Sequence, residues 1–170
     1  DEMLLNLSDL QRNDISFILE LVRQDGLNLK YASKRIQANF DIVKLAVSDN
    51  GFALKYASIA LKKNSEIVDI AISTNGMALE FVDDSLKFDM DLILKAILSY
   101  GSIAPLKFVK QFITQHESFV LNLIKKHSLA INYLHPSYTT TKNKALKLIR
   151  LNGSILQYLS MELRADFDIV

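Results

Sequence analysis

The stretch that decides the fold is Asn50-Gly51-Phe52-Ala53-Leu54-Lys55-Tyr56-Ala57-Ser58, because the chain repeats it at a fixed interval. All five glycines of the chain occupy the position of Gly51 in such copies: Gly26, Gly51, Gly76, Gly101 and Gly153. The first three gaps between them are 25 residues each, and the last is 52, with Ser128 in the skipped place. Self-similarity at a constant period of this size predicts a repeat array.

Each period carries two helical patterns on either side of its glycine. The pattern before Gly51 places Ile42, Val43, Ala46 and Val47 on one face of a helix with 3.6 residues per turn. The pattern after Gly51 forms a second helix with Leu54, Tyr56, Ala57 and Leu61 as its apolar side. Helices of about ten residues are marginal alone, so neighbouring pairs must stack to bury a common core.

The sequence therefore predicts an all-α fold, an α-solenoid formed by a right-handed superhelical stack of about six 25-residue helix-hairpin repeats. We expect one array over residues 1–170, a piece of a longer protein. The expected repeats are roughly 11–35, 36–60, 61–85, 86–112, 113–137 and 138–162, with a truncated seventh from 163 that copies Ile36 to Val43. Met3 to Leu7 resembles the second helix of an earlier copy.

Local signals mark the ends of these helices. Glycine adopts the left-handed conformation after a helix without a steric cost, so the glycines Gly26, Gly51, Gly76, Gly101 and Gly153 are predicted as structural helix stops. The short polar side chains of Asn13, Asn39, Asn64 and Asp166 precede first helices and are predicted to cap them. The fourth copy, from Ser102 to Phe108, reaches its aromatic residue two positions late.

Composition excludes several classes of protein. The 170 residues include 20 Lys+Arg, 19 Asp+Glu and no Cys, and 49% of them are hydrophobic, so a packed core is possible without disulfides or Cys-ligated zinc. No transmembrane segment or signal peptide is visible. These features fit a protein of a cytosolic-type environment.

No arrangement of residues predicts chemistry, so the expected catalytic, cofactor-binding and metal-binding residues are none. His116, His127 and His135 are too far apart to form a metal motif on one helix. Ser33, Ser58 and Ser160 recur with the period, which favours helix packing over a nucleophile. The recurring aromatic residues are assigned to the hairpin cores: Tyr31, Tyr56, Phe81, Phe108, Tyr133 and Tyr158.

Residues 101–150 hold eight Lys or Arg residues and a single acid, Glu117. Such a charge asymmetry attracts an anionic partner. We predict a non-catalytic protein-interaction module whose acidic partner contacts Lys107, Lys110, Lys125, Lys126 and Lys142. The alternative is an anionic lipid or a nucleic acid bound by the same segment, with Phe108, Phe112 and Tyr138 as candidates for base stacking. An enzyme domain is a third possibility, which would need a cleft that brings acids and histidines together.

The stretch Asn50 to Ser58 resembles the consensus LRNDKEFVLAAVKQNGLALKYAS of a repeat family known as domain of unknown function 4116. The resemblance is strongest from Asp14 to Ser85 and weaker from Gly101 to Lys144. Such repeats occur in secreted effector proteins of bacteria of the Legionella type. The resemblance implies a virulence-related effector module delivered into the host cell cytosol, or the regulatory or substrate-recognition part of a multidomain effector enzyme. It supplies no catalytic residues.

Overall fold

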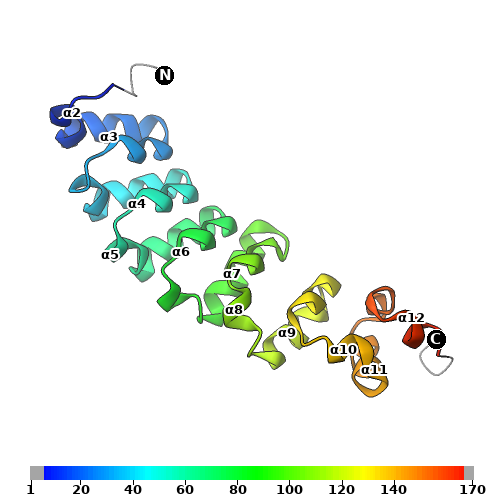
Figure 1. Ribbon diagram of the computed structural model, residues 1–170. Coiled ribbons are helices and arrows are strands. Elements are labelled where there is room, and N and C mark those ends of the chain that lie inside the picture. Colours follow the sequence, from blue (N-terminus) through cyan, green and yellow to red (C-terminus); the bar gives the residue numbers. More distant parts are fainter. Residues whose placement is uncertain (1–5, 167–170) are drawn as a thin grey trace. The chain divides into compact units, whose positions relative to one another are not determined.

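The computed structural model describes residues 6–166 of the chain, and within them it contains helices and no β-strands. Figure 1 shows these helices as short hairpins that follow one another along the chain. The structure divides into two compact units, Asp1–Phe108 (unit 1) and Val109–Val170 (unit 2), which are described separately. Across the described residues, no helix combines the length and apolar character needed to cross a membrane.

Each repeat contains one long α-helix. These helices begin at intervals of 25 or 27 residues: α3 (Ile15–Gln24), α4 (Phe40–Asp49), α6 (Ser65–Thr74), α7 (Met90–Tyr100), α9 (Glu117–Ile124) and α11 (Lys142–Leu151). The regular spacing confirms the predicted all-α repeat fold. The longer interval lies between α7 and α9, in the repeat where the sequence is two residues longer.

The second part of each repeat is a 3₁₀-helix. These helices are η1 (Gly26–Tyr31), η3 (Gly51–Tyr56), η4 (Gly76–Phe81), η6 (Ala104–Phe108), η7 (Ser128–Tyr133) and η8 (Gly153–Tyr158). A short helix precedes each long one: α2 (Asp9–Asn13), η2 (Ile36–Ala38), α5 (Ile59–Lys62), η5 (Asp84–Leu86), α8 (Lys110–Ile113) and α10 (Ser137–Thr140); α12 (Met161–Arg164) follows η8. The prediction of a second helix of about ten residues is therefore wrong, because the chain turns after six residues at an extended residue such as Ala57.

The core of each unit comes from the predicted apolar faces. Ile42, Val43, Ala46 and Val47 of α4 are all buried, as the helical pattern predicts. Within unit 1, α3, α4, α6 and α7 pack on one another in that order, and η1, η3, η4 and η6 do the same on the adjoining side (Figure 1). In unit 2, α9 packs on α11 and η7 packs on η8. Each repeat thus buries its apolar residues against its neighbours in the chain.

Polar side chains cap the long helices. The Oδ1 atoms of Asn39 and Asn64 accept hydrogen bonds of 3.1 Å from the backbone N–H groups of Ile42 and Ile67, which confirms both predicted caps. The cap predicted at Asn13 is wrong, because Asp14 caps α3 through the N–H of Phe17 at 3.1 Å. Asn13 instead donates to the Asp9 carbonyl within α2. The cap predicted at Asp166 concerns residues 167–170, which lie outside the described residues.

The glycines end the long helices by a mechanism other than the one predicted. Gly101 alone has a positive φ, 75°, as expected for a left-handed stop. Gly26, Gly51, Gly76 and Gly153 each follow an Asp or Asn whose side chain accepts the N–H of the residue after the glycine. The prediction of a left-handed conformation is wrong for these four, because this Asx turn starts a 3₁₀-helix directly.

Close packing explains why glycine is needed in unit 1. A Cβ atom added to Gly26, Gly51 or Gly76 would lie 2.3, 2.3 or 2.0 Å from the carbonyl oxygen of an alanine in the next long helix. Those alanines are Ala46, Ala71 and Ala96. Because the glycine and the facing alanine are both small, the start of each 3₁₀-helix can contact the backbone of the following repeat. The requirement for glycine at these positions therefore comes from the contact with the next repeat.

Backbone hydrogen bonds also join the two ends of single repeats, from the short first helix to the turn after the 3₁₀-helix. The N–H groups of Ser33 and Ser58 donate to the carbonyl groups of Arg12 and Gln37, at 2.8 and 2.9 Å. Asp83 and Ser160 make the same kind of bond to Lys62 and Thr139. The hydroxyls of Ser33, Ser58 and Ser160 accept from backbone N–H groups three residues further on. The recurrence of serine is therefore a matter of turn capping.

The two predictions made for the ends of the chain fall mainly outside the described residues. Three of the five residues of the helix expected at Met3 to Leu7, residues 3–5, lie outside the described residues. Most of the first helix of the expected seventh copy lies in residues 167–170, which are also outside the description.

Candidate functional site

The five lysines predicted to contact a partner are distributed over both units. Lys107 lies in the last turn of η6 in unit 1, and its ammonium group lies 4.7 Å from the centre of the Phe108 ring. Lys110, Lys125, Lys126 and Lys142 belong to unit 2. The predicted set is therefore not one cluster within one unit.

Lys142 differs from the other three lysines of unit 2. Its Nζ atom lies 3.0 Å from Oδ2 of Asp166, so the charge at the start of α11 is neutralised by an acid two residues after α12. Lys110, Lys125 and Lys126 are exposed. These three remain accessible to a partner.

A groove of about 550 Å³ in unit 2 brings Lys125 together with Lys147. Its lining comes from α9, the residue that follows it, and α11: Ser118, Phe119, Leu121, Asn122, Lys125, Lys147 and Leu151. It contains two cations, three apolar side chains and no acid. We call this hollow the α9–α11 groove. It combines apolar contact with positive charge, a pairing that suits an acidic segment with apolar side chains.

The sequence analysis counted Lys147 among the basic residues but did not select it as a site residue. Lys125 and Lys147 are 22 residues apart, so no local spacing connects them. The long helices of neighbouring repeats pack side by side. Their register, however, aligns Lys125 with Arg150 and Asn122 with Lys147, so comparison of equivalent positions would not have paired these two lysines.

The aromatic residues considered for base stacking are mostly unavailable. Phe112 and Tyr138 are 9% and 4% exposed, so neither ring can offer a face to a nucleic-acid base. The Tyr138 hydroxyl donates a hydrogen bond to Glu117 Oε1. Lys144 lies 4.8 Å from the centre of the Tyr138 ring and donates to the Ser137 hydroxyl. Tyr138 and Glu117 therefore link α10 to α9 as part of the fold.

This contact makes the stability of unit 2 depend on pH. Burial, followed by the hydrogen bond to Glu117, raises the pKa of Tyr138 from 10.0 to about 12. Between these values the unfolded chain has released the phenolic proton and the folded chain still holds it. The stabilisation is present below pH 10.0 and is lost as the pH rises toward about 12.

We expect the free energy of unfolding of the Tyr138→Phe variant to approach that of the wild type across this alkaline range. Urea titrations at a series of pH values measure the difference, and Tyr100→Phe is the control because Tyr100 is 47% exposed. A difference between wild type and Tyr138→Phe that stays constant with pH would contradict this account.

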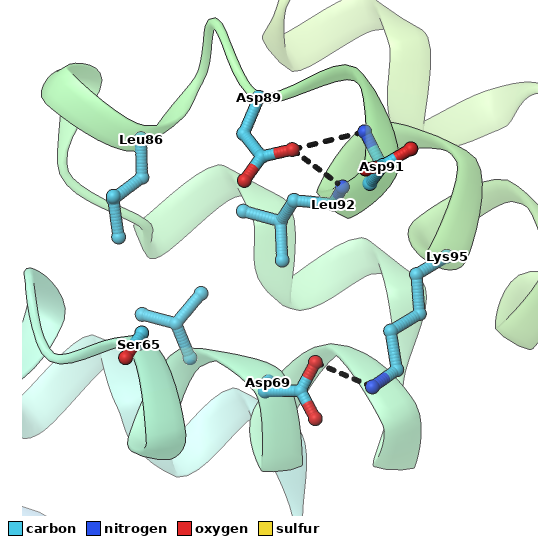
Figure 2. Close-up of a pocket in the computed structure, with 8 residues that line it drawn as sticks. Ser65, Asp69, Leu86, Asp89, Asp91, Leu92 and Lys95 are labelled. Atoms are coloured by element: carbon cyan, nitrogen blue, oxygen red, sulfur yellow. Dashed lines mark hydrogen bonds and ion pairs between the residues drawn. The ribbon is translucent and has the colours of Figure 1, made fainter.

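A second hollow, between α6 and α7, is lined by three aspartates, of which Asp69 and Asp89 have structural roles (Figure 2). Asp69 forms an ion pair with Lys95 across the two helices. Asp89 caps α7, since its Oδ1 atom accepts from the N–H groups of Asp91 and Leu92 at 2.9 and 3.2 Å. Figure 2 shows both arrangements, with the Asp89 carboxylate directed at the start of its own helix. These carboxylates are held in structural contacts and do not converge on one point.

The three histidines lie at different turns of the chain. His135 Nδ1 accepts a hydrogen bond from the backbone N–H of Ser137 at 3.2 Å, within a local turn. His116 and His127 stand immediately before α9 and η7. In residues 6–166, no group of three or more His, Cys, Asp or Glu side chains is arranged to hold a metal ion.

These observations define an all-α repeat protein with a basic groove on the surface of unit 2. The family model described as a domain of unknown function (DUF4116) matches residues 14–63 and 64–111, more than half of the chain. The chain belongs to this family, as the repeated stretch predicts. Each matched segment spans about two of the 25-residue periods. No match is found among curated proteins or solved structures.

Proposed function

We propose that this chain is a non-catalytic interaction module that binds an acidic segment of a partner protein. The observation that supports this function is the α9–α11 groove, with Lys125 and Lys147 beside the apolar side chains of Phe119, Leu121 and Leu151. An acidic segment with one or two apolar residues would place its carboxylates near the ammonium groups and its apolar side chains in the groove. Charge complementarity of this kind sets the association rate and the choice of partner.

A nucleic-acid partner is less well supported. Two of the three aromatic residues suited to stacking are buried, and Tyr138 is held by Glu117. The head groups of an anionic lipid surface would contact the lysines and would leave the apolar side chains of the groove without a contact. Of the five lysines first selected, Lys125 is the one that lines this groove, and Lys126 and Lys110 are exposed cations of the same unit.

The biological setting that we propose rests on the family resemblance. Repeats of this type in secreted bacterial effectors suggest that the module acts in a host cell cytosol, as the recognition or regulatory part of a larger protein. An extended repeat surface suits this role, since it offers contacts to another macromolecule without a catalytic centre.

A peptide-display selection against the purified chain tests the function directly. We expect the selected peptides to be enriched in Asp and Glu with interspersed apolar residues. The double variant Lys125→Glu, Lys147→Glu should bind a selected peptide at least about tenfold more weakly, because two attractive contacts become repulsive. Fluorescence anisotropy with the labelled peptide measures the change.

The matched control is the double variant Lys126→Glu, Arg150→Glu. It reverses the same number of charges on exposed neighbours of the groove residues, and neither side chain lines the groove. We expect it to lose less than about threefold in affinity, because exposed charges outside a contact act mainly through screened, long-range attraction. Selected peptides without acidic residues, or equal losses in the two double variants, would show that the proposal is wrong.

A further inference from the structure

A hollow of about 560 Å³ in unit 1 gathers four lysines that the charge count of the sequence did not single out. Lys30 comes from η1, Lys34 from the turn after it, Lys55 from η3, and Lys62 from α5. The remaining lining includes Gln37 and Tyr56 and no acidic side chain. We call this hollow the four-lysine pocket. Its volume is in the range of sites for small molecules.

The four ammonium groups have no counter-charge among the described residues. The other four lysines of residues 6–100 do have a counter-charge: Lys44 pairs with Glu66, Lys63 with Asp83, Lys87 with Asp84 and Lys95 with Asp69. No carboxylate of residues 6–166 lies within ion-pair distance of Lys30, Lys34, Lys55 or Lys62. Burial, and then the charge of Lys34, lowers the pKa of Lys62. The pocket thus holds positive charges at close range that the protein does not neutralise.

The repeat register shows that the fold does not require an unpaired lysine at position 62. Lys62 occupies the position of Gln37 one repeat earlier and of Lys87 one repeat later. Both neighbours have partners in the protein. Gln37 Nε2 donates to the Leu29 carbonyl at 3.2 Å, and Lys87 Nζ lies 3.0 Å from Asp84 Oδ1. Lys62 has neither contact.

Acids occupy the equivalent positions in the repeat 61–85. Glu80 corresponds to Lys30 and Lys55, and Asp84 corresponds to Lys34. Asp84 lies three residues before Lys87, whereas the equivalent place three residues before Lys62 is held by Ile59. The same backbone therefore accepts either sign of charge at these exposed positions. Their concentration as lysines around one hollow is independent of what the fold needs.

We propose that the four-lysine pocket binds a small ligand that carries two or more phosphate groups. Lysine ammonium groups are compact, strongly hydrated donors that bind phosphate as point charges. Four ammonium groups in one pocket fit a ligand with several negative charges better than a ligand with a single carboxylate. The Tyr56 ring and hydroxyl border the same hollow and supply a contact for the remainder of the ligand. This site lies in unit 1 and is independent of the α9–α11 groove.

Isothermal titration calorimetry with inositol hexakisphosphate and with pyrophosphate tests the proposal. We expect saturable binding of at least one probe to the wild-type chain, weakened at least about tenfold in the double variant Lys34→Gln, Lys62→Gln. A second double variant, Lys30→Gln, Lys55→Gln, should weaken it as well. Both of these residues are exposed, so the variant keeps the test valid if the first fails to fold.

Lys63→Gln is the control variant. Lys63 is adjacent to Lys62 in the sequence and pairs with Asp83 at 3.8 Å outside the pocket. It should retain affinity within about twofold, since only long-range charge is lost. The peptide that binds the α9–α11 groove should bind the Lys34→Gln, Lys62→Gln variant normally, which keeps failure of one site distinct from failure of the other.

The source of the phosphates is distinguished with vesicles. Sedimentation with phosphatidylcholine vesicles that contain a phosphatidylinositol bisphosphate, lost in the Lys34→Gln, Lys62→Gln variant, would assign a lipid head group. Binding of the free probes alone would assign a soluble ligand. The proposal is overturned if neither probe binds, if Lys63→Gln weakens binding as much as the pocket variants, or if an oligonucleotide binds the pocket and the small probes do not.

Discussion

Replacement of Gly76 by alanine should destabilise unit 1 by about 3 kcal/mol. The new Cβ would lie 2.0 Å from the Ala96 carbonyl oxygen and 2.8 Å from the Ser99 hydroxyl oxygen. Alanine reduces the entropy of the unfolded chain, but that gain is only about 0.4–1 kcal/mol. The clash is larger because the carbonyl belongs to the backbone of α7 and cannot turn aside. Chemical denaturation followed by circular dichroism measures the loss, and hydrogen exchange locates it in η4 and α7.

Gly153→Ala is the matched control. Gly153 begins η8 after Asn152 in the same Asx turn, yet nothing lies within 4 Å of a Cβ built on it. Without a clash, only the effect on the unfolded chain remains, so we expect a stabilisation of about 0.5 kcal/mol. A loss at Gly153 as large as that at Gly76 would mean that backbone conformation, and not the contact with the next repeat, requires glycine.

Leu54→Ala should cost about 3 kcal/mol. Leu54 is fully buried in η3, which packs against η1, η4, α4 and α6. Truncation of its side chain would leave a cavity that these elements cannot close without breaking their own contacts. In an array, the loss spreads through the interfaces on both sides of the altered repeat. The shift of the urea transition gives the magnitude.

Leu156→Ala provides the comparison for that loss. Leu156 occupies the same repeat position in η8 but is only partly buried. Its truncation removes less apolar contact, so we expect a cost of about 1 kcal/mol. Equal losses at the two positions would contradict the view that stability depends on having a packed repeat on each side.

The repeat and its core followed directly from the sequence, because one face of each long helix is read from spacings such as Ile42, Val43, Ala46 and Val47. The second helix was predicted too long. A run such as Gly51 to Tyr56 fits an α-helix and a 3₁₀-helix equally well by apolar pattern. The role of the glycines was also missed, because their close contacts involve residues 20 positions further on.

The basic sites were harder to predict, since a count of charges along the chain cannot show which side chains share a hollow. Residues 101–150 stood out by composition, yet their lysines are divided between the units and Lys142 is paired with Asp166. The four-lysine pocket lies within residues 1–100, which taken together hold 15 acids and 11 basic residues. Comparison of equivalent positions, such as Lys34 with Asp84, contained the missing information.

The contact of Gly26, Gly51 and Gly76 with the alanines of the next helix has an evolutionary consequence. At the interface between neighbouring repeats, only two small residues and a few apolar ones must be kept for the repeats to pack. The outward-facing positions, such as those of Lys55 and Glu80, are then free to diversify. A lineage could recombine or duplicate modules and acquire a new ligand preference by a handful of codon changes, without redesign of the joint that holds one module to the next.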